Sequence, residues 1–388
     1  MLVFDFDIPT KIVFGSGKID ELKKAKLPGK MAMIVIEQDT VLKENGTLNK
    51  VLDSLNRQEI EYLIYDKITQ NPTKSMIMEA SQIARDNFCN FVLGVGGGSV
   101  IDASKAIALM TRNPGDLWDY MMTGSGKGLP LKNRALPVIA VPTTAGSGSE
   151  ANPWIVITNE QLHEKIAFGK TSTFPMISFV DPDLTKSVPP FLTAIQGLDS
   201  FYRAVQGYIA KKATPVSDVF ALKTISLIAD NLRSTVEDGS NSDLRANISL
   251  ASMLSGFVSS LSGVTSLCAM ADAMCAYHPE LPHGAAQVML AVPYFTFFAK
   301  IVPEKLCAMC DAMGVPSESD PMRFVETIAR LHEKCNLTGL KMTEYGIQAD
   351  DMELLARNAY RTMSNLFAMD RYPLSLKETV GIFEKAFM

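Results

Sequence analysis

The feature that most constrains the fold is a change of pattern near residue 186. Before it, short apolar runs alternate with amphipathic stretches such as Leu48–Leu55 and Ser75–Arg85. The apolar runs predict β-strands at Met31–Glu37, Glu61–Tyr65, Phe91–Val95, Leu136–Pro142 and Ile177–Asp181. Alternating strands and helices are typical of a parallel sheet with helices on both faces. After Pro189–Pro190, helical patterns follow one another to the end. The sequence therefore predicts an N-terminal α/β domain over residues 1–185 and an all-helical C-terminal domain over residues 186–388.

Composition and charge exclude several classes of protein. The 388 residues are 47% hydrophobic and 20% charged, which excludes a disordered or fibrous chain. The net charge of −5, with no long basic run, argues against nucleic acid as a partner. No apolar run reaches the roughly 18 residues of a membrane span. The amino end has no basic region typical of a signal peptide. The six cysteines are scattered along the chain, which fits a reducing compartment. We therefore expect a cytoplasmic protein.

A glycine-rich turn is the strongest chemical signal in the first half. The segment FVLGVGGGSVIDASKAIAL, residues 91–109, is an apolar strand that runs through Gly96, Gly97, Gly98 and Ser99 directly into a helix. Glycines let the backbone approach a ligand closely, and the free N–H groups of a helix start favour a phosphate. The segment is neither a GxGxxG fingerprint nor a P-loop. A tight turn capped by Ser99 is the alternative interpretation.

A second loop strengthens the case for a nucleotide. VPTTAGSGSE, residues 141–150, follows another buried strand and is rich in hydroxyl and glycine residues. Two such loops at neighbouring strand ends indicate a dinucleotide rather than a lone phosphate. An acid after the second strand would bind the adenosine ribose, and Glu37 and Asp39 are both candidates, which favours NAD over NADP.

With these residues identified, the chain resembles the iron-containing (group III) alcohol dehydrogenase family along nearly its full length. The matching segments, in family order, are IPTKIVFG, NPT at Asn71–Thr73, GGGSVIDASK, PTTAGSGSE, DPDLT at Asp181, TAIQGLD, and LPHG at Leu281–Gly284. The resemblance implies NAD(P)-dependent reduction of aldehydes or oxidation of alcohols by a homodimer or larger homo-oligomer. It also implies cofactor contacts at Gly97, Gly98, Ser99, Asp102, Thr143 and Thr144, with Asn71 and Lys165 nearby.

The sequence departs from the family at the metal site, which consists of an aspartate and three histidines. Asp199 matches the aspartate, but the histidine four residues later is Arg203, which cannot ligate a cation. In the segment CAMAD, Cys268 stands at the next histidine ligand position. Asp272 replaces a further histidine, which in the family is often near the substrate. His283 matches the last ligand.

Three interpretations of this site remain open. In the first, Asp199, Cys268 and His283 hold zinc or iron with one open position. In the second there is no metal. The side chain of Arg203 occupies the place of the metal ion, and the carboxylates of Asp199 and Asp272 neutralise its positive charge. The guanidinium then anchors an anionic substrate or polarises a carbonyl. In the third, a buried ion pair fills an inactive site, and the protein binds nucleotide with little turnover.

We therefore expect an NAD(P)-dependent oxidoreductase that interconverts a small aldehyde and a primary alcohol by hydride transfer. The alternative is a nucleotide-binding protein with a lost metal site and little dehydrogenase activity. The candidate catalytic residues are Asp199, Arg203, Cys268, Asp272 and His283.

Overall fold

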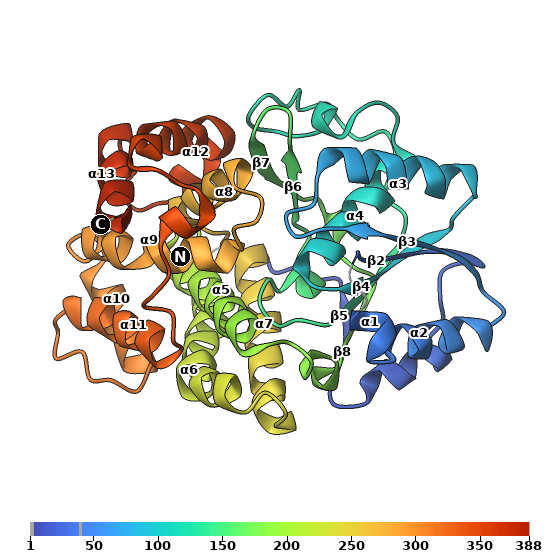
Figure 1. Cartoon of the computed structure of the whole chain (residues 1–388), viewed down its shortest axis with the longest axis horizontal. Helices are drawn as coiled ribbons and strands as arrows, with labels where there is room; N and C mark the ends of the chain where they lie inside the picture. The colour runs from blue at the N-terminus through green and yellow to red at the C-terminus, as the bar shows by residue number, and fades with distance from the viewer. Residues whose placement is uncertain (1–3, 39–40, 388) are drawn as a thin grey trace.

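Six parallel strands form the sheet of the N-terminal half in the computed structural model, which describes residues 4–38 and 41–387 (Figure 1). Their order across the sheet is β1-β8-β5-β4-β2-β3. The strands are β1 (Lys11–Phe14), β2 (Met31–Glu37), β3 (Glu61–Ile68), β4 (Phe91–Gly96), β5 (Val138–Pro142) and β8 (Ile177–Val180). All five strands predicted from the sequence are confirmed, with ends that differ by up to three residues, and β1 is an additional edge strand.

The strands at the centre of the sheet are apolar because both of their faces are covered. Along β2, Met33 and Val35 point into one hydrophobic core, whereas Ile34 and Ile36 point into another on the opposite face. This alternation follows from the two-residue period of a strand. The covering helices are α1 (Val41–Glu44), α2 (Thr47–Asn56), α3 (Lys74–Asp86) and α4 (Gly98–Arg112). The doubly covered parallel sheet predicted from the sequence is thus present.

Strands β4 and β5 are neighbours in register, and this pairing positions the two glycine-rich loops. Val95 pairs with Val141 and Gly96 with Pro142. The carboxyl ends of both strands therefore lie at the same edge of the sheet. The segments that follow them leave the sheet side by side, facing the helical half (Figure 1).

A two-stranded antiparallel hairpin was not predicted from the sequence. It consists of β6 (Ile155–Asn159) and β7 (Glu164–Phe168). Each strand has only five residues, and a polar loop separates them, so the hydrophobic signal is weak. The hairpin packs against helices of the C-terminal half and carries Lys165 toward them.

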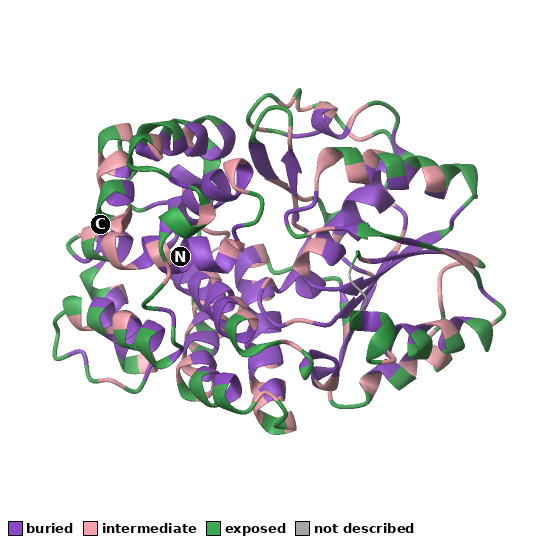
Figure 2. Ribbon diagram, viewed as in Figure 1, coloured by how far each residue is buried: buried purple, intermediate pink, exposed green. Residues whose placement is uncertain are grey.

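The C-terminal half is helical, as predicted. Its helices are α5 (Pro190–Ile209), α6 (Pro215–Glu237), α7 (Ser242–Leu261), α8 (Ser266–Tyr277), α9 (His283–Phe298), α10 (Pro303–Ala312), α11 (Met322–Lys334), α12 (Met352–Phe367) and α13 (Leu376–Phe387). Figure 2 shows that α5 and α8 are largely buried, whereas the outer helices present exposed faces to solvent. The central position of α5 and α8 places their polar residues in the interior, beside the sheet.

Within the described part of the chain, no single helix is long and apolar enough to span a membrane. Helices α7 and α8 together satisfy the length and composition criteria, but they meet at an angle of 108°.

Candidate active site

One cavity of about 750 Å³ runs from the carboxyl edge of the sheet to the helical half. It is lined by the glycine turn of α4, the hairpin, the inner ends of α5, α7 and α8, the start of α9 and the end of α12. The predicted residues that line it are Glu37, Asn71, Gly97, Gly98, Ser99, Asp102, Thr144, Lys165, Asp199, Arg203, Cys268, Asp272 and His283. The fold thus brings the glycine turn and the polar cluster of the helical half to one continuous space.

The glycine turn forms the sheet end of the cavity. Gly97 has extended backbone and precedes α4, which begins at Gly98, so the first N–H groups of the helix lie at the cavity wall. The Gly97 N–H donates to Glu37 Oε1 at 3.3 Å, which ties the end of β2 to the turn. An added Cβ at Gly98 would lie 2.4 Å from Ser147 Oγ in the second loop. The two loops therefore pack closely, and glycine is required at this point of contact.

Two predicted nucleotide contacts, Gly96 and Thr143, do not line the cavity. Gly96 is the last residue of β4 and lies behind the cavity wall, where its carbonyl accepts from the N–H of Thr143 at 3.0 Å. Thr143 is likewise buried outside the lining, whereas the adjacent Thr144 lines the cavity. Asp39 lies outside the described residues.

Asp102 has a structural role in addition to lining the cavity. Its Oδ2 accepts from the Val156 N–H at 3.2 Å, and its Oδ1 is 3.4 Å from Lys105 Nζ. The bond from Val156 attaches α4 to the hairpin, whereas the contact with Lys105 is within α4. Burial lowers the pKa of Lys105, although Asp102 opposes that shift.

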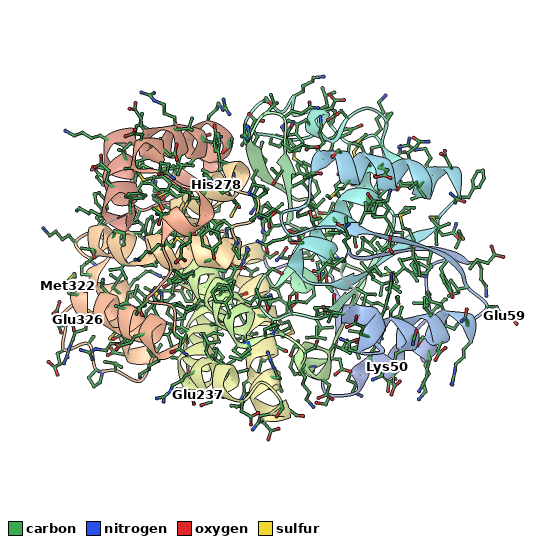
Figure 3. The ribbon with its side chains drawn as sticks, in the orientation of Figure 1. Lys50, Glu59, Glu237, His278, Met322 and Glu326 are labelled. Carbon is green, nitrogen blue, oxygen red and sulfur yellow. The ribbon has the colours of Figure 1, made fainter. Side chains whose placement is uncertain are left out.

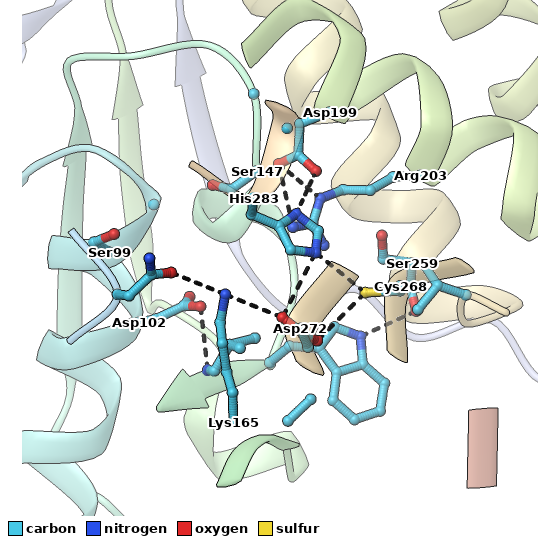
Figure 4. A pocket seen from close by; sticks show the side chains of 18 of the residues that line it. Ser99, Asp102, Ser147, Lys165, Asp199, Arg203, Ser259, Cys268, Asp272 and His283 are labelled. Atoms are coloured by element: carbon cyan, nitrogen blue, oxygen red, sulfur yellow. Dashed lines mark hydrogen bonds and ion pairs between the residues drawn. The ribbon is translucent and has the colours of Figure 1, made fainter. Parts of the chain in front are cut away.

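Lys165 connects the two halves at the middle of the cavity (Figure 4). Its Nζ donates to Asn71 Oδ1 at 2.9 Å and lies 3.0 Å from Asp272 Oδ1. Burial alone would lower the pKa of Lys165, but the negatively charged surroundings, Asp272 included, outweigh it and raise the pKa above its ordinary value. Asn71, at φ +55°, donates from Nδ2 to the carbonyls of Pro279 and Leu281, just before α9. Asn71 thereby fixes the loop that leads to His283.

On α5, Asp199 and Arg203 lie one turn apart and face each other. Asp199 Oδ2 accepts from Nε and Nη2 of Arg203, both at 3.2 Å. Asp199 Oδ1 lies 3.0 Å from His283 Nδ1. Burial raises the pKa of Asp199, but Arg203 and His283 more than offset this and lower it overall. Asp199 is therefore an ionised carboxylate whose two oxygens both have partners.

On α8, Cys268 and Asp272 are also one turn apart, and both point toward the imidazole of His283 (Figure 4). Cys268 Sγ is 3.6 Å from Asp272 Oδ2 and 3.6 Å from His283 Nε2. His283 Nε2 is 3.6 Å from Asp272 Oδ1. Burial and the Asp272 carboxylate raise the pKa of the Cys268 thiol.

Of the four positions that correspond to the family's metal ligands, Asp199 and Arg203 are paired with each other. Asp199 is committed to Arg203 and to Nδ1 of His283, and Arg203 has no lone pair to give. The three side chains whose ligand atoms converge are instead Cys268, Asp272 and His283. The expectation that Asp199, Cys268 and His283 share one ion is therefore not supported by the geometry. His278, at the end of α8, does not line the cavity (Figure 3).

Several lining residues were missed from the sequence. Trp154 precedes the hairpin and donates from Nε1 to the Ser259 carbonyl at 3.0 Å, and Met363 and Leu366 reach the cavity from α12. Met363 has non-helical backbone at a kink in α12. No local pattern distinguishes these residues, because only the packing of distant segments brings them to the cavity.

Comparisons with known proteins agree with the fold. The family model described as iron-containing alcohol dehydrogenase matches residues 9–182, and that of the C-terminal domain of the same family matches residues 193–387. The chain is 30% identical to 1,3-propanediol dehydrogenase of Citrobacter freundii, over 99% of each chain. It is 28% identical to lactaldehyde reductase of Escherichia coli (strain K12), over 89% of this chain and 90% of that one. An archaeal halo-thermophilic alcohol dehydrogenase from a Red Sea brine pool has the same fold, with a TM-score of 0.94 and 28% identity over 100% and 99% of the two chains.

This chain belongs to the iron-containing alcohol dehydrogenase family. It is accordingly an oxidoreductase of the alcohol and aldehyde class.

Proposed function

We propose that the protein is an NAD(P)-dependent dehydrogenase that interconverts a small aldehyde and a primary alcohol. The observation that carries this proposal is the single cavity that joins the glycine turn at Gly97–Ser99 to the polar cluster around Arg203. A dinucleotide with its pyrophosphate at the start of α4 would extend toward Lys165 and Asp272. The cofactor supplies the hydride, and the protein supplies orientation and charge.

The preferred cofactor in this proposal is NAD. Glu37 lies at the end of β2, and its carboxylate is bonded to the N–H of Gly97 in the glycine turn. A carboxylate at this point suits a ribose hydroxyl and repels a 2′-phosphate.

Arg203 is the proposed source of positive charge for the developing oxyanion. When hydride reaches an aldehyde carbon, negative charge grows on the oxygen, and a proton completes the alcohol. Arg203 is partly buried, with 14% of its side chain exposed, yet permanently charged, since Asp199 raises its pKa against the effect of burial. Arg203 and Lys165 are each paired with a carboxylate. The cluster therefore has little net charge, which favours a neutral aldehyde over an anionic substrate.

The test is NADH consumption with a panel of short aldehydes, comparing the wild type with Arg203→Ala, Arg203→Lys and Lys212→Ala. Lys212 is an exposed cation that lines the same cavity, so it serves as the matched control. We expect Arg203→Ala to lower kcat/KM by at least about 100-fold while NADH binding changes much less. Arg203→Lys should recover part of the lost kcat/KM, and Lys212→Ala should change kcat/KM little. Equal turnover in Arg203→Ala would refute the role of this residue.

The alternative is a nucleotide-binding protein without dehydrogenase activity. The observation that favours it is the arginine at a family ligand position, where it is locked to Asp199. NADH binding without turnover across the aldehyde panel would support this alternative and refute the enzyme.

We also propose a cytoplasmic homodimer or larger homo-oligomer with neither a nucleic acid nor a membrane partner. Light scattering of the purified protein tests the assembly, because a monomer has a mass of 42.4 kDa. A mass of one chain would refute it.

A further inference from the structure

A buried arginine without a carboxylate partner lies outside the active-site cavity. Among the described residues, three lysine or arginine side chains are buried: Lys105, Lys165 and Arg245. Lys105 Nζ lies 3.4 Å from a carboxylate oxygen of Asp102, and Lys165 Nζ lies 3.0 Å from one of Asp272. Arg245 is 3% exposed, and its only partners in the described part of the chain are neutral oxygens. Basic side chains are almost never fully buried unless they are paired, so the positive charge of Arg245 requires an explanation.

The hydrogen bonds of Arg245 use only part of its guanidinium. Nε donates to the Gly239 carbonyl at 2.8 Å, Nη1 to Thr193 Oγ1 at 3.0 Å and Nη2 to the Val188 carbonyl at 2.9 Å. One N–H group on each terminal nitrogen therefore has no acceptor within residues 4–38 and 41–387. Burial lowers the pKa of Arg245, and no carboxylate of the described residues counteracts this shift.

Arg245 lines a second cavity, which has a volume of about 290 Å³. One wall is the connection between the two halves, Lys186–Pro190, and another is the loop from α6 to α7, which includes Gly239 and Ser240. This volume far exceeds the roughly 30 Å³ that one water molecule occupies in the liquid, so a polyatomic ion fits. None of the residues that line it lines the active-site cavity.

The other charged residues of this second cavity do not balance Arg245. Lys186 and Glu237 line it, and both are exposed. Lys186 Nζ lies 2.7 Å from a carboxylate oxygen of Asp183, and a carboxylate oxygen of Glu237 lies 2.8 Å from Arg233 Nε. Each of these charges thus has a partner of its own, and the buried guanidinium does not.

We propose that the second cavity binds a small oxyanion of the phosphate or sulfate type. A guanidinium binds two oxygens of one oxyanion through its planar fork of N–H groups, and one such group is free on each terminal nitrogen of Arg245. The anion would balance the buried charge, as Asp102 balances Lys105 and Asp272 balances Lys165. The proposal does not rest on the proposed function, because the two cavities share no residue.

Binding at this place would stabilise the joint between the two halves. Arg245, on α7, holds Val188 in the connection and Thr193 in the first turn of α5. An anion that holds the guanidinium in place would also hold these two segments. A ligand that binds only the folded state raises the free energy of unfolding as its concentration increases.

Isothermal titration calorimetry of the full-length protein with inorganic phosphate tests the site. The ionic strength is kept constant with sodium chloride, which separates the binding of an oxyanion from the screening of charge. We expect saturable binding of about one phosphate per chain that depends on Arg245, with displacement by sulfate but not by chloride. The midpoint of thermal unfolding should rise over the same range of phosphate concentration.

Two variants and a matched control assign the binding. Arg245→Lys keeps the charge but loses the planar fork, so we expect phosphate affinity to fall by at least about tenfold. Gly239→Ala keeps the arginine but places a Cβ 2.5 Å from its Nη2, which is the end of a flexible side chain. The guanidinium must therefore move, and affinity should fall while the fold persists. Arg330→Lys is the control, because Arg330 is an exposed arginine of α11 that lies 3.6 Å from Glu326.

Gly98→Ala separates this site from the start of α4, where the proposed pyrophosphate site lies. We expect the phosphate that depends on Arg245 to remain bound in Gly98→Ala and in Arg330→Lys. Circular dichroism checks that each variant is folded. If Arg245→Lys does not fold, Gly239→Ala decides the result.

Several results would overturn the proposal: no saturable phosphate binding by the folded wild type, unchanged affinity in folded Arg245→Lys, or an equal loss in Arg330→Lys. Binding that is lost in Gly98→Ala but kept in Arg245→Lys, or displaced equally by chloride and sulfate, would do the same. A protein that binds phosphate at Arg245 but leaves every aldehyde unreacted refutes the proposed function alone. A protein that consumes NADH without binding phosphate there refutes only the anion site.

Discussion

Gly284→Ala tests whether the close approach of α9 to α5 is what positions His283. Gly284 is the second residue of α9, and an added Cβ would lie 2.2 Å from the carbonyl oxygen of Ile195 on α5. Real Cβ atoms essentially never approach other heavy atoms within 3.0 Å. The obstacle is backbone, which cannot rotate away as a side chain would. The two helices must therefore separate by about 0.8 Å or more.

The expected magnitudes follow from that displacement. Overpacking of this kind costs about 1–3 kcal/mol, of which the better helix propensity of alanine offsets about 1 kcal/mol. We expect the free energy of unfolding to fall by about 0–2 kcal/mol. The bond from His283 Nδ1 to Asp199 Oδ1, now 3.0 Å, would lengthen beyond hydrogen-bond range. A misplacement near 1 Å can cost about 100-fold in rate, so kcat/KM for aldehyde reduction should fall by about that factor.

Urea unfolding measures the change in the free energy of unfolding, and NADH oxidation measures the change in kcat/KM for aldehyde reduction. The control is Gly381→Ala in α13, a helical glycine whose added Cβ would meet no atom within 4 Å. This variant should be unchanged in activity and more stable by about 0.5–1 kcal/mol. If Gly284→Ala matches the control in both measurements, the argument from the helix contact is wrong.

Two further predictions concern stability and nucleotide binding. Burial raises the pKa of Asp370 to about 7 from an ordinary value of 3.8, so the stability contributed by its neutral form is complete below about pH 4 and is lost as the pH rises through 7. Between pH 5 and pH 8, the free energy of unfolding measured with urea should fall by about 2–3 kcal/mol more in the wild type than in Asp370→Asn. If the free energies of the two proteins change in parallel with pH, this prediction is wrong. Gly98→Ala places a Cβ 2.4 Å from Ser147 Oγ, and we expect NADH affinity, followed by fluorescence titration, to fall by about tenfold or more. Unchanged affinity would count against a pyrophosphate site at the start of α4.

Much of the fold could be predicted from local pattern. The strands β2, β4 and β5 are apolar runs bounded by turn residues, and the glycine-rich turn after β4 predicts where α4 begins. The hairpin β6–β7 escaped prediction because five-residue strands with charged residues carry too little periodic signal. Because Lys165 lies on that hairpin, its contacts with Asn71 and Asp272 could not be predicted from the sequence either.

The sequence by itself determined which residues are available for chemistry: the two glycine-rich loops, and the replacement of family histidines by Arg203, Cys268 and Asp272. Only the tertiary structure decided how these residues are paired. Asp199 and Cys268 lie on different helices, and both could have faced the same ion. Because the Arg203 guanidinium and His283 Nδ1 already occupy both oxygens of Asp199, the ligand atoms that converge belong to Cys268, Asp272 and His283. Spacing along one helix fixes which side chains share a face, but hydrogen-bond partners contributed by a neighbouring helix determine the direction in which each ligand atom points.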